Sequence, residues 1–283
     1  MAQNELKIKV REAVVALKKK TTLWPKVAIV LGSGLGGFAD SLSDPQSISV
    51  EQIPHYPLPT VPGHAGRWVF GSIGSAPILA IEGRVHLYEG YTLEQVTFPV
   101  QVAAALGVQA LVVTTACGGL NPRFCAGDLM LIRDHINFVG RNPLRGRIDQ
   151  LLGSRFVDLG ESYDRELLQI ARQAGQACAV QLQEGVFVWM SGPNYETAAE
   201  VRMLHALGGD AVSMSTVPEV IVARQRHLRV LGISLITNLG TGLSAEQLRH
   251  EDVTASAKQA QERFSALLHV ILPRVHAHFS PAL

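Results

Sequence analysis

The sequence predicts an α/β fold built on a largely parallel sheet that helices cover on both faces. Short apolar runs rich in β-branched residues alternate with longer segments of helical period, and this alternation is typical of such sheets. The chain has 283 residues, 47% of them hydrophobic, which is enough for one large core or two modest ones. Because no linker or internal repeat divides the sequence, we expect a single domain over residues 1–283.

In the N-terminal half, residues 1–24 mix charged and apolar positions and predict an amphipathic helix rather than a signal peptide. The predicted elements that follow are a strand at Val27–Leu31, a hairpin of Phe70–Gly71 and Pro77–Glu82, a helix at Leu93–Ala105, and strands at Ala110–Thr115 and Leu129–Ile132. The long apolar region 98–120 contains Pro99 and Gly107, so we divide it into a helix and a strand rather than reading it as a membrane span.

The C-terminal half continues the alternation. The predicted elements are a helix at Asp164–Ala179, a strand at Gly185–Met190, a helix at Glu196–Leu207, a strand at Ala211–Met214, a helix at Pro218–Arg226, a strand at Val230–Thr237, and a long helix over residues 252–272. Each strand is short enough to be buried between helices, as an α/β sheet requires.

The charge balance excludes several classes of partner. Lys and Arg number 25 against 24 Asp and Glu, for a net charge of +1, so nothing favours a nucleic acid. The three cysteines form no C-x-x-C pair, which indicates a reducing compartment, and we infer a cytoplasmic protein without membrane attachment. The ten histidines form no metal-ligand motif, so no metal site is expected.

Polar residues gather after the predicted strands, where α/β sheets bind their ligands. They are Ser33, Arg84, His86, Ala116, Glu196, Ser215 and Asn238.

The first of these strands ends in the glycine-rich turn "GSGLGG", which matches G-x-G-x-x-G from Gly32. A dinucleotide site also needs an acidic residue about 20 residues later at the end of a second strand. Here Glu51 comes too early and a proline-rich segment follows it. The turn therefore favours a smaller anion, which backbone N–H groups, Ser33, Arg84 and His86 could hold. Taken alone, Arg84 and His86 favour a surface Arg–Glu ion pair and a packed histidine over an anion site.

Several longer motifs make the sequence specific. "LGSGLGG", "VPGHAGR", "EGRVHLYEGY", "FPVQVAAALGV", "GDLMLIRDHIN", "NPLRG", "SGPNYETAAEVRML", "MSTVPEVIVAR" and "SLITN" occur in this order. Together they resemble the trimeric, 6-oxopurine-specific purine nucleoside phosphorylases from about Val27 to the C-terminal helix. The resemblance implies a single-domain nucleoside phosphorylase fold, with a mixed central β-sheet flanked by helices, and a homotrimer.

The resemblance also implies an activity, the reversible phosphorolysis of inosine, guanosine and their 2′-deoxy forms in purine salvage. The products are the free base and α-(deoxy)ribose 1-phosphate, and neither a metal nor an organic cofactor takes part. Phosphate would bind at Ser33, His64, Arg84, His86, Ser215 and the backbone N–H of Ala116. The nucleoside would bind at Tyr88, Tyr195, Glu196, Met214, Thr237, Asn238 and His250. Phe156 matches the phenylalanine that closes the neighbouring subunit's site.

The chemistry explains why such a site needs these residues. Cleavage of the N-glycosidic bond leaves negative charge on the purine, which the Asn238 amide can stabilise by donating to N7. Glu196 can accept from N1–H and from a 2-amino group. A 6-aminopurine has no N1–H and would place a lone pair against the carboxylate, so we expect adenosine to be rejected by about 10⁴-fold. Catalysis would then depend on Asn238, Glu196, His86 and His250.

Some positions depart from the family's usual sequence. Thr115 and Cys117 stand in "TACGG" where "NAAGG" is common, and Ser213 stands where "GMS" is usual. We expect the Ser213 hydroxyl to lie close to the base and to affect base fit or sugar preference. The text before Phe156, "RIDQLLGSRF", differs from the usual "DERFG".

Three alternatives remain open at this stage. A xanthosine-preferring phosphorylase would share Glu196 and Asn238. A 5′-methylthioadenosine phosphorylase would favour an aspartate in place of Asn238 and a different residue in place of Glu196. A catalytically silent nucleoside-binding protein on the same fold would release no base.

Overall fold

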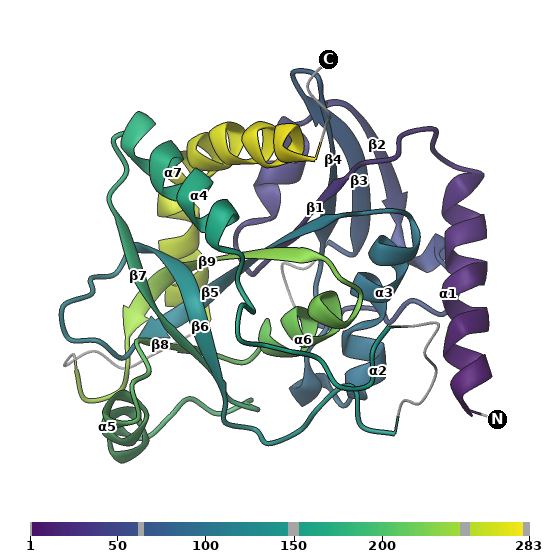
Figure 1. The fold of residues 1–283 in the computed structure, drawn as a ribbon. Coiled ribbons are helices and arrows are strands. Elements are labelled where there is room, and N and C mark those ends of the chain that lie inside the picture. The colour runs from purple at the N-terminus through teal and green to yellow at the C-terminus, as the bar shows by residue number, and fades with distance from the viewer. Residues whose placement is uncertain (1, 62–64, 147–152, 244–249, 280–283) are drawn as a thin grey trace.

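One sheet of nine strands organises the described part of the chain (Figure 1). The computed structural model describes residues 2–61, 65–146, 153–243 and 250–279, with the backbone alone for residues 2–4 and 250–259. The strands are β1 (Val27–Leu31), β2 (Ser43–Ser49), β3 (Arg67–Ile73), β4 (Ala76–Glu82), β5 (Ala110–Gly119), β6 (Leu129–Asn137), β7 (Leu182–Trp189), β8 (Ala211–Ser213) and β9 (Arg229–Leu239).

The sheet is mixed, and its order is β2-β3-β4-β1-β5-β8-β7-β6-β9. Strand β1 pairs in parallel with β4 and β5, whereas β3 pairs antiparallel with β2 and β4. The largely parallel sheet expected from the alternation alone is therefore wrong, and the mixed sheet implied by the family resemblance is confirmed. The antiparallel β3–β4 pair arises because a short turn joins the two strands without a helical crossover.

Strand β5 is the branch point of the sheet. Its first part pairs with β1, its whole length pairs in parallel with β9, and its last two residues pair antiparallel with β8. Because β9 also pairs with β6, the strands β5, β8, β7, β6 and β9 close on one another. Side chains where β5 leaves β1 and meets β8 are thus brought beside residues from distant parts of the sequence.

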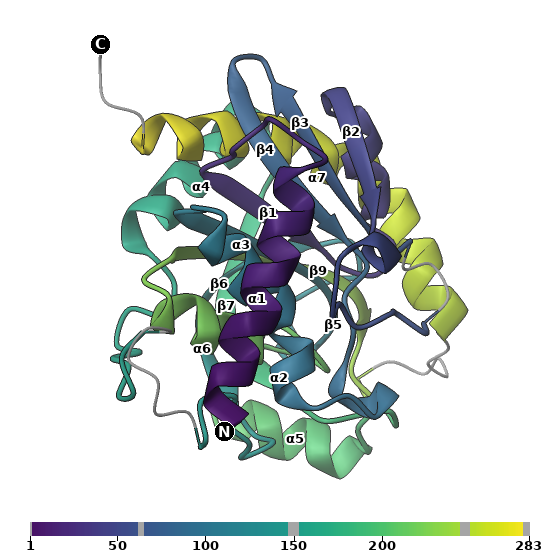
Figure 2. The same cartoon turned by 90° about the vertical axis from the view of Figure 1, so that its right-hand side faces the viewer.

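The helices lie on both sides of the sheet (Figures 1 and 2). They are α1 (Ala2–Lys18), α2 (Leu93–Val96), α3 (Phe98–Ala105), α4 (Arg165–Ala177), α5 (Ala198–Ala206), α6 (Val217–Gln225) and α7 (His250–His278), with 3-10 turns at Gly36–Ser41, Val50–Gln52 and Leu87–Glu89. Helix α7 packs across β1, β3, β4, β5 and β9, and α1 packs on the outside of α3. No helix among the described residues is both long and apolar enough to cross a membrane.

The structure differs from the sequence prediction in a few elements. The helix predicted at Leu93–Ala105 is divided at Thr97, because Pro99 has no N–H and its ring clashes with the carbonyl four residues earlier. Strand β2 is missing from the prediction because its residues are mostly polar and exposed, and they include Pro45. Strands β5 and β9 run past their predicted ends, so Ala116 and Asn238 lie within strands rather than after them.

Candidate active site

A cleft opens where β1, β5, β8 and β9 come together. Its lining includes most of the residues that the sequence analysis assigned to phosphate and nucleoside. The lining residues are Ser33, His86, Tyr88, Ala116, Cys117, Gly118, Tyr195, Glu196, Val212, Ser213, Met214, Thr237, Asn238 and Gly240. Residues more than 200 positions apart in the chain thus line the same cleft.

The glycine-rich turn holds Ser33 at one end of this cleft. Gly32 lies so close to β5 that a Cβ atom there would be 2.8 Å from the Thr114 carbonyl oxygen. Its N–H donates to Thr114 Oγ1 at 3.2 Å, and Gly34 has a φ of 74°, in the left-handed region. Glycines are therefore required for backbone approach and for turn geometry, and they place Ser33 beside β5.

Arg84 is buried behind the cleft rather than lining it. Its Nε lies 2.9 and 3.0 Å from the two carboxylate oxygens of Glu219, and its Nη1 donates to the Thr114 carbonyl at 3.1 Å. The side chains of Arg84 and Glu219 are each 3% exposed. No sequence motif links Arg84 to Glu219, which lies on α6, 135 residues away.

His86 lies on the cleft wall and is held by Glu89, a residue that the sequence analysis missed. Glu89 Oε1 accepts from the backbone N–H of His86 at 2.6 Å and lies 2.8 Å from His86 Nδ1. Its other oxygen accepts from the N–H and hydroxyl of Thr60. Hydrogen bonds from His86 and Thr60 outweigh burial and lower the pKa of Glu89 to about 2. The spacing of three residues in "HLYE" is the signal that could have revealed this pair.

Tyr88 continues the wall beyond His86. The two rings stack with their centroids 4.7 Å apart and their planes 15° apart. Burial, with Glu89 nearby, raises the pKa of Tyr88 to about 12, so its phenol keeps its proton at neutral pH. This wall presents a neutral ring face, suited to a sugar, next to the histidine.

At the other end of the cleft Glu196 precedes helix α5. Thr197 caps that helix, accepting from the N–H of Glu200 and donating its own N–H to the Glu200 carboxylate. The cap holds the chain at the residue before it, which places Glu196 at the cleft. Burial, reinforced by Glu200, raises the pKa of Glu196 above its ordinary value.

Asn238 faces the same end from β9. Thr237 donates its hydroxyl to Asn238 Oδ1 at 2.8 Å, and Asn238 Nδ2 donates to the Leu239 carbonyl at 3.1 Å. A Cβ atom on Gly118 would lie 3.3 Å from Asn238 Nδ2. The oxygen of the amide is therefore turned toward Thr237, and the nitrogen, which carries two protons, lies toward Gly118, another residue of the cleft lining.

A cluster of hydroxyl groups lies between β5 and β8. Ser213 Oγ donates to the Ala116 carbonyl at 2.9 Å, and Thr115 Oγ1 lies 3.1 Å from the same oxygen. Thr115 Oγ1 is also 3.2 Å from Ser215 Oγ and 3.5 Å from Ser213 Oγ. Ser215 is buried and does not itself line the cleft, but Thr115 connects it to Ser213, which does.

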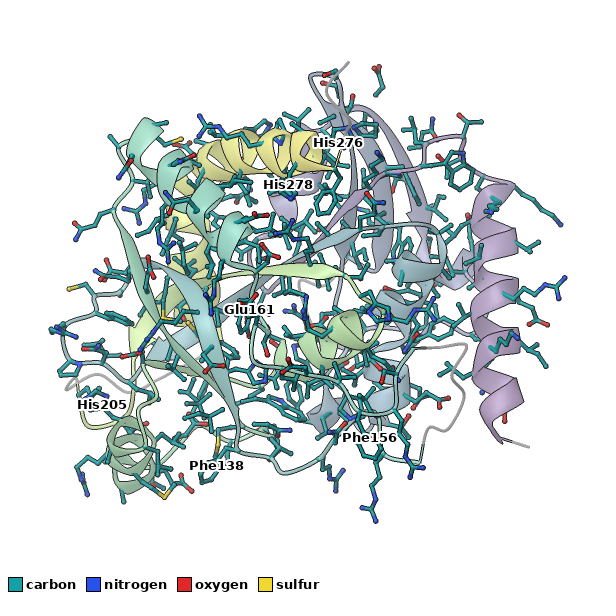
Figure 3. The ribbon with its side chains drawn as sticks, viewed as in Figure 1. Phe138, Phe156, Glu161, His205, His276 and His278 are labelled. Atoms are coloured by element: carbon teal, nitrogen blue, oxygen red, sulfur yellow. The ribbon has the colours of Figure 1, made fainter. Side chains whose placement is uncertain are left out.

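Phe156 lies away from the cleft of its own chain, and two other assigned residues cannot be placed relative to it. The side chain of Phe156 is 87% exposed and lies on the outer edge of the molecule with Phe138 (Figure 3). His64 lies outside the described residues, and so does the side chain of His250, which begins α7. Within the described residues, His, Cys, Asp and Glu side chains form no group of three or more that could hold a metal ion.

Comparisons with known proteins agree with this geometry. Residues 26–273 match the model of the phosphorylase superfamily. The purine nucleoside phosphorylase of Bos taurus is 50% identical over 88% of this chain and 90% of its own length. By family model and by relatives of this kind, the chain belongs to the purine nucleoside phosphorylases of the phosphorylase superfamily.

Solved structures show the same fold with ligands. A Schistosoma mansoni purine nucleoside phosphorylase in complex with inosine has a TM-score of 0.89 at 34% identity and covers 97% of both chains. A complex of a Schistosoma mansoni purine nucleoside phosphorylase with adenosine has a TM-score of 0.90 at 36% identity, covering 94% of this chain and 96% of the other.

Proposed function

We propose that this chain catalyses the reversible phosphorolysis of 6-oxopurine ribonucleosides and 2′-deoxyribonucleosides, chiefly those of hypoxanthine and guanine. One observation carries the proposal. One cleft is lined both by Ser33 and His86, which suit a phosphate, and by Glu196 and Asn238, which suit a purine base. Tyr88 and Met214 belong to the same lining, and a ribose that links the two groups would lie against them.

At Ser33 and His86, phosphate is the nucleophile. The Ser33 hydroxyl, the His86 ring and the backbone N–H of Ala116 would hold its oxygens below the sugar. Arg84 and Ser215 stand behind this wall and complete the donor set. Fixed there, a phosphate dianion supplies negative charge next to the anomeric carbon as positive charge develops on the sugar.

At Glu196 and Asn238, the purine leaves as its negative charge grows. The Asn238 amide would donate to N7, and the Glu196 carboxylate would accept from N1–H. An interaction that strengthens as charge develops lowers the barrier more than it tightens substrate binding. Adenosine, which lacks N1–H, should therefore be turned over about 10⁴-fold less efficiently.

The assembly belongs to the same proposal. We propose a homotrimer in which Phe156 of one subunit closes the cleft of the next, and its 87% exposure in the single chain supports this. We also propose that the enzyme acts in the cytoplasm, in purine salvage, without a metal or organic cofactor. Three cysteines that form no disulfide support the compartment.

The test follows base release from inosine with and without inorganic phosphate, using xanthosine and adenosine in parallel. We expect phosphate-dependent release of hypoxanthine, and ribose 1-phosphate as the second product. Because a related structure is a complex with adenosine, adenosine binding and adenosine turnover should be measured separately. Release from inosine without phosphate would make the protein a hydrolase, and efficient release from adenosine would overturn the assignment of Glu196.

A further inference from the structure

We propose that Thr115 and Ser213 are a coupled pair of positioning residues that direct the hydroxyl of Ser215 toward phosphate. The inference rests on the proposed function and goes beyond it, because it assigns a task to two of the positions where the chain departs from the family's usual sequence. These positions are 98 residues apart, yet their hydroxyl oxygens lie 3.5 Å apart in the fold.

The backbone explains why a hydroxyl at position 213 is useful. Strands β5 and β8 pair only through Gly118–Val212 and Gly119–Ala211. Just before this point the Ser213 hydroxyl donates to the Ala116 carbonyl at 2.9 Å. The side chain at position 213 thus adds a link between the two strands next to the proposed phosphate donor, the N–H of Ala116.

The number of hydroxyl protons available for donation then connects Ser213 with Ser215. Each hydroxyl has a single proton to donate, and both Ser213 and Thr115 lie within reach of the Ala116 carbonyl. When Ser213 satisfies that carbonyl, Thr115 can donate to Ser215 Oγ, which lies 3.2 Å away. Ser215 then accepts from Thr115 and keeps its own proton for an acceptor in front of it.

Without the Ser213 hydroxyl, the hydrogen bond between Thr115 and Ser215 would reverse its direction. Thr115 would donate its proton to the Ala116 carbonyl, and its Oγ1 would then accept the proton of the Ser215 hydroxyl. Phosphate would lose Ser215 as a donor. Thr216 Oγ1 also lies 3.2 Å from Ser215 Oγ, so Thr216 is the other residue that can donate a hydrogen bond to Ser215. Thr115, Ser215 and Thr216 are 2%, 6% and 1% exposed, so water does not easily replace a missing partner.

The experiment measures inorganic phosphate binding by calorimetry in the absence of nucleoside, and then KM for phosphate and for inosine. Ser213→Ala and Thr115→Val should each weaken phosphate binding about tenfold, the order of one lost hydrogen bond to a charged group, and should leave KM for inosine nearly unchanged. The double variant should be no weaker than either single variant, because the two residues act as a unit. Ser213→Thr, which retains the hydroxyl, should restore binding.

Three further variants keep the outcome interpretable. In a Ser215→Ala background, neither substitution should weaken phosphate binding further. Ser234→Ala is the matched control. Ser234 is buried on β9 in register with Thr115, but it does not line the cleft. The Ser234→Ala variant should therefore bind phosphate as tightly as the wild type. Thr216→Val would test whether Thr216 alone orients Ser215.

The outcomes separate this inference from the proposed function. If the wild-type protein binds no phosphate, the proposed function fails. If the wild type binds phosphate and the single variants bind it equally well, or the two effects add, the coupled pair is refuted. A rise in KM for inosine rather than phosphate would also refute it and would place the Ser213 hydroxyl at the base or the sugar.

Discussion

Arg84 and Glu219 form an ion pair that is buried behind the phosphate end of the cleft, with each side chain 3% exposed. The pair joins the segment after β4 to helix α6 and leaves Arg84 Nη1 directed at the Thr114 carbonyl. A buried charge without its partner is costly. Both the orientation of the Arg84 side chain and the neutralisation of its positive charge therefore depend on Glu219.

Glu219→Gln should therefore lower the free energy of unfolding by about 3 kcal/mol, because it leaves a buried guanidinium without a counter-charge. Urea denaturation at neutral pH measures this loss. Glu161→Gln is the matched control: Glu161 pairs with Arg165 on the surface, where the side chains are 55% and 80% exposed, and such a pair contributes about 0.5 kcal/mol or less. Equal losses in both variants would contradict a structural role for the buried pair.

Glu89 predicts a pH dependence of stability. Its pKa is lowered to about 2 in the folded protein from an ordinary value of 4.5, because His86 and Thr60 donate hydrogen bonds to its carboxylate. A group with a lowered pKa stabilises the fold above its unfolded pKa, and this contribution is lost as the pH falls from about 4.5 to about 2.

Glu89→Gln should accordingly remove part of the acid sensitivity. We expect the wild type to lose more stability than the variant between pH 4.5 and pH 2, as followed by thermal unfolding. At neutral pH the variant should be less stable than the wild type and have a higher KM for phosphate, because His86 loses its carboxylate partner. Parallel stability curves over this acid range would argue against the lowered pKa.

Glu196 predicts a pH dependence of activity. Burial raises its pKa above the ordinary value, and only the ionised carboxylate can accept from both N1–H and a 2-amino group. The kcat/KM for inosine should therefore begin to fall, as the pH is lowered, above the ordinary carboxyl pKa of 4.5. Glu196→Gln should lower kcat/KM for inosine by about 100-fold and reduce the discrimination against adenosine. If discrimination is unchanged in the variant, another residue selects the base.

Phe156 predicts an effect across subunits. Phe156→Ala should raise KM for inosine about tenfold without changing the unfolding of the subunit, because the ring is 87% exposed in the single chain and packs on no core. Steady-state kinetics and size-exclusion chromatography measure the two properties. Trp24→Ala, at another exposed aromatic side chain (45%), should leave KM unchanged. A wild-type protein that elutes as a monomer would refute the trimer.

Much of this site could be predicted from the sequence, because its residues lie in contiguous motifs whose local geometry is short-ranged. The glycine turn places Ser33, a strand end places His86, and a capped helix places Glu196 within a few residues of each signal. Glu219 and the contact of Thr115 with Ser213 could not be found in this way, since no local pattern records which distant side chain a buried group will meet.

By itself the sequence determined the strand–helix alternation, most element positions and the chemical types of the cleft residues, since these depend on periodicity, turn residues and motifs within short segments. Only the tertiary structure decided that β5 meets both β8 and β9, that Arg84 is neutralised by Glu219, and that Ser213 faces Thr115. These features depend on contacts between segments about 100 or more residues apart in sequence, and such contacts exist only after the chain has packed into one core.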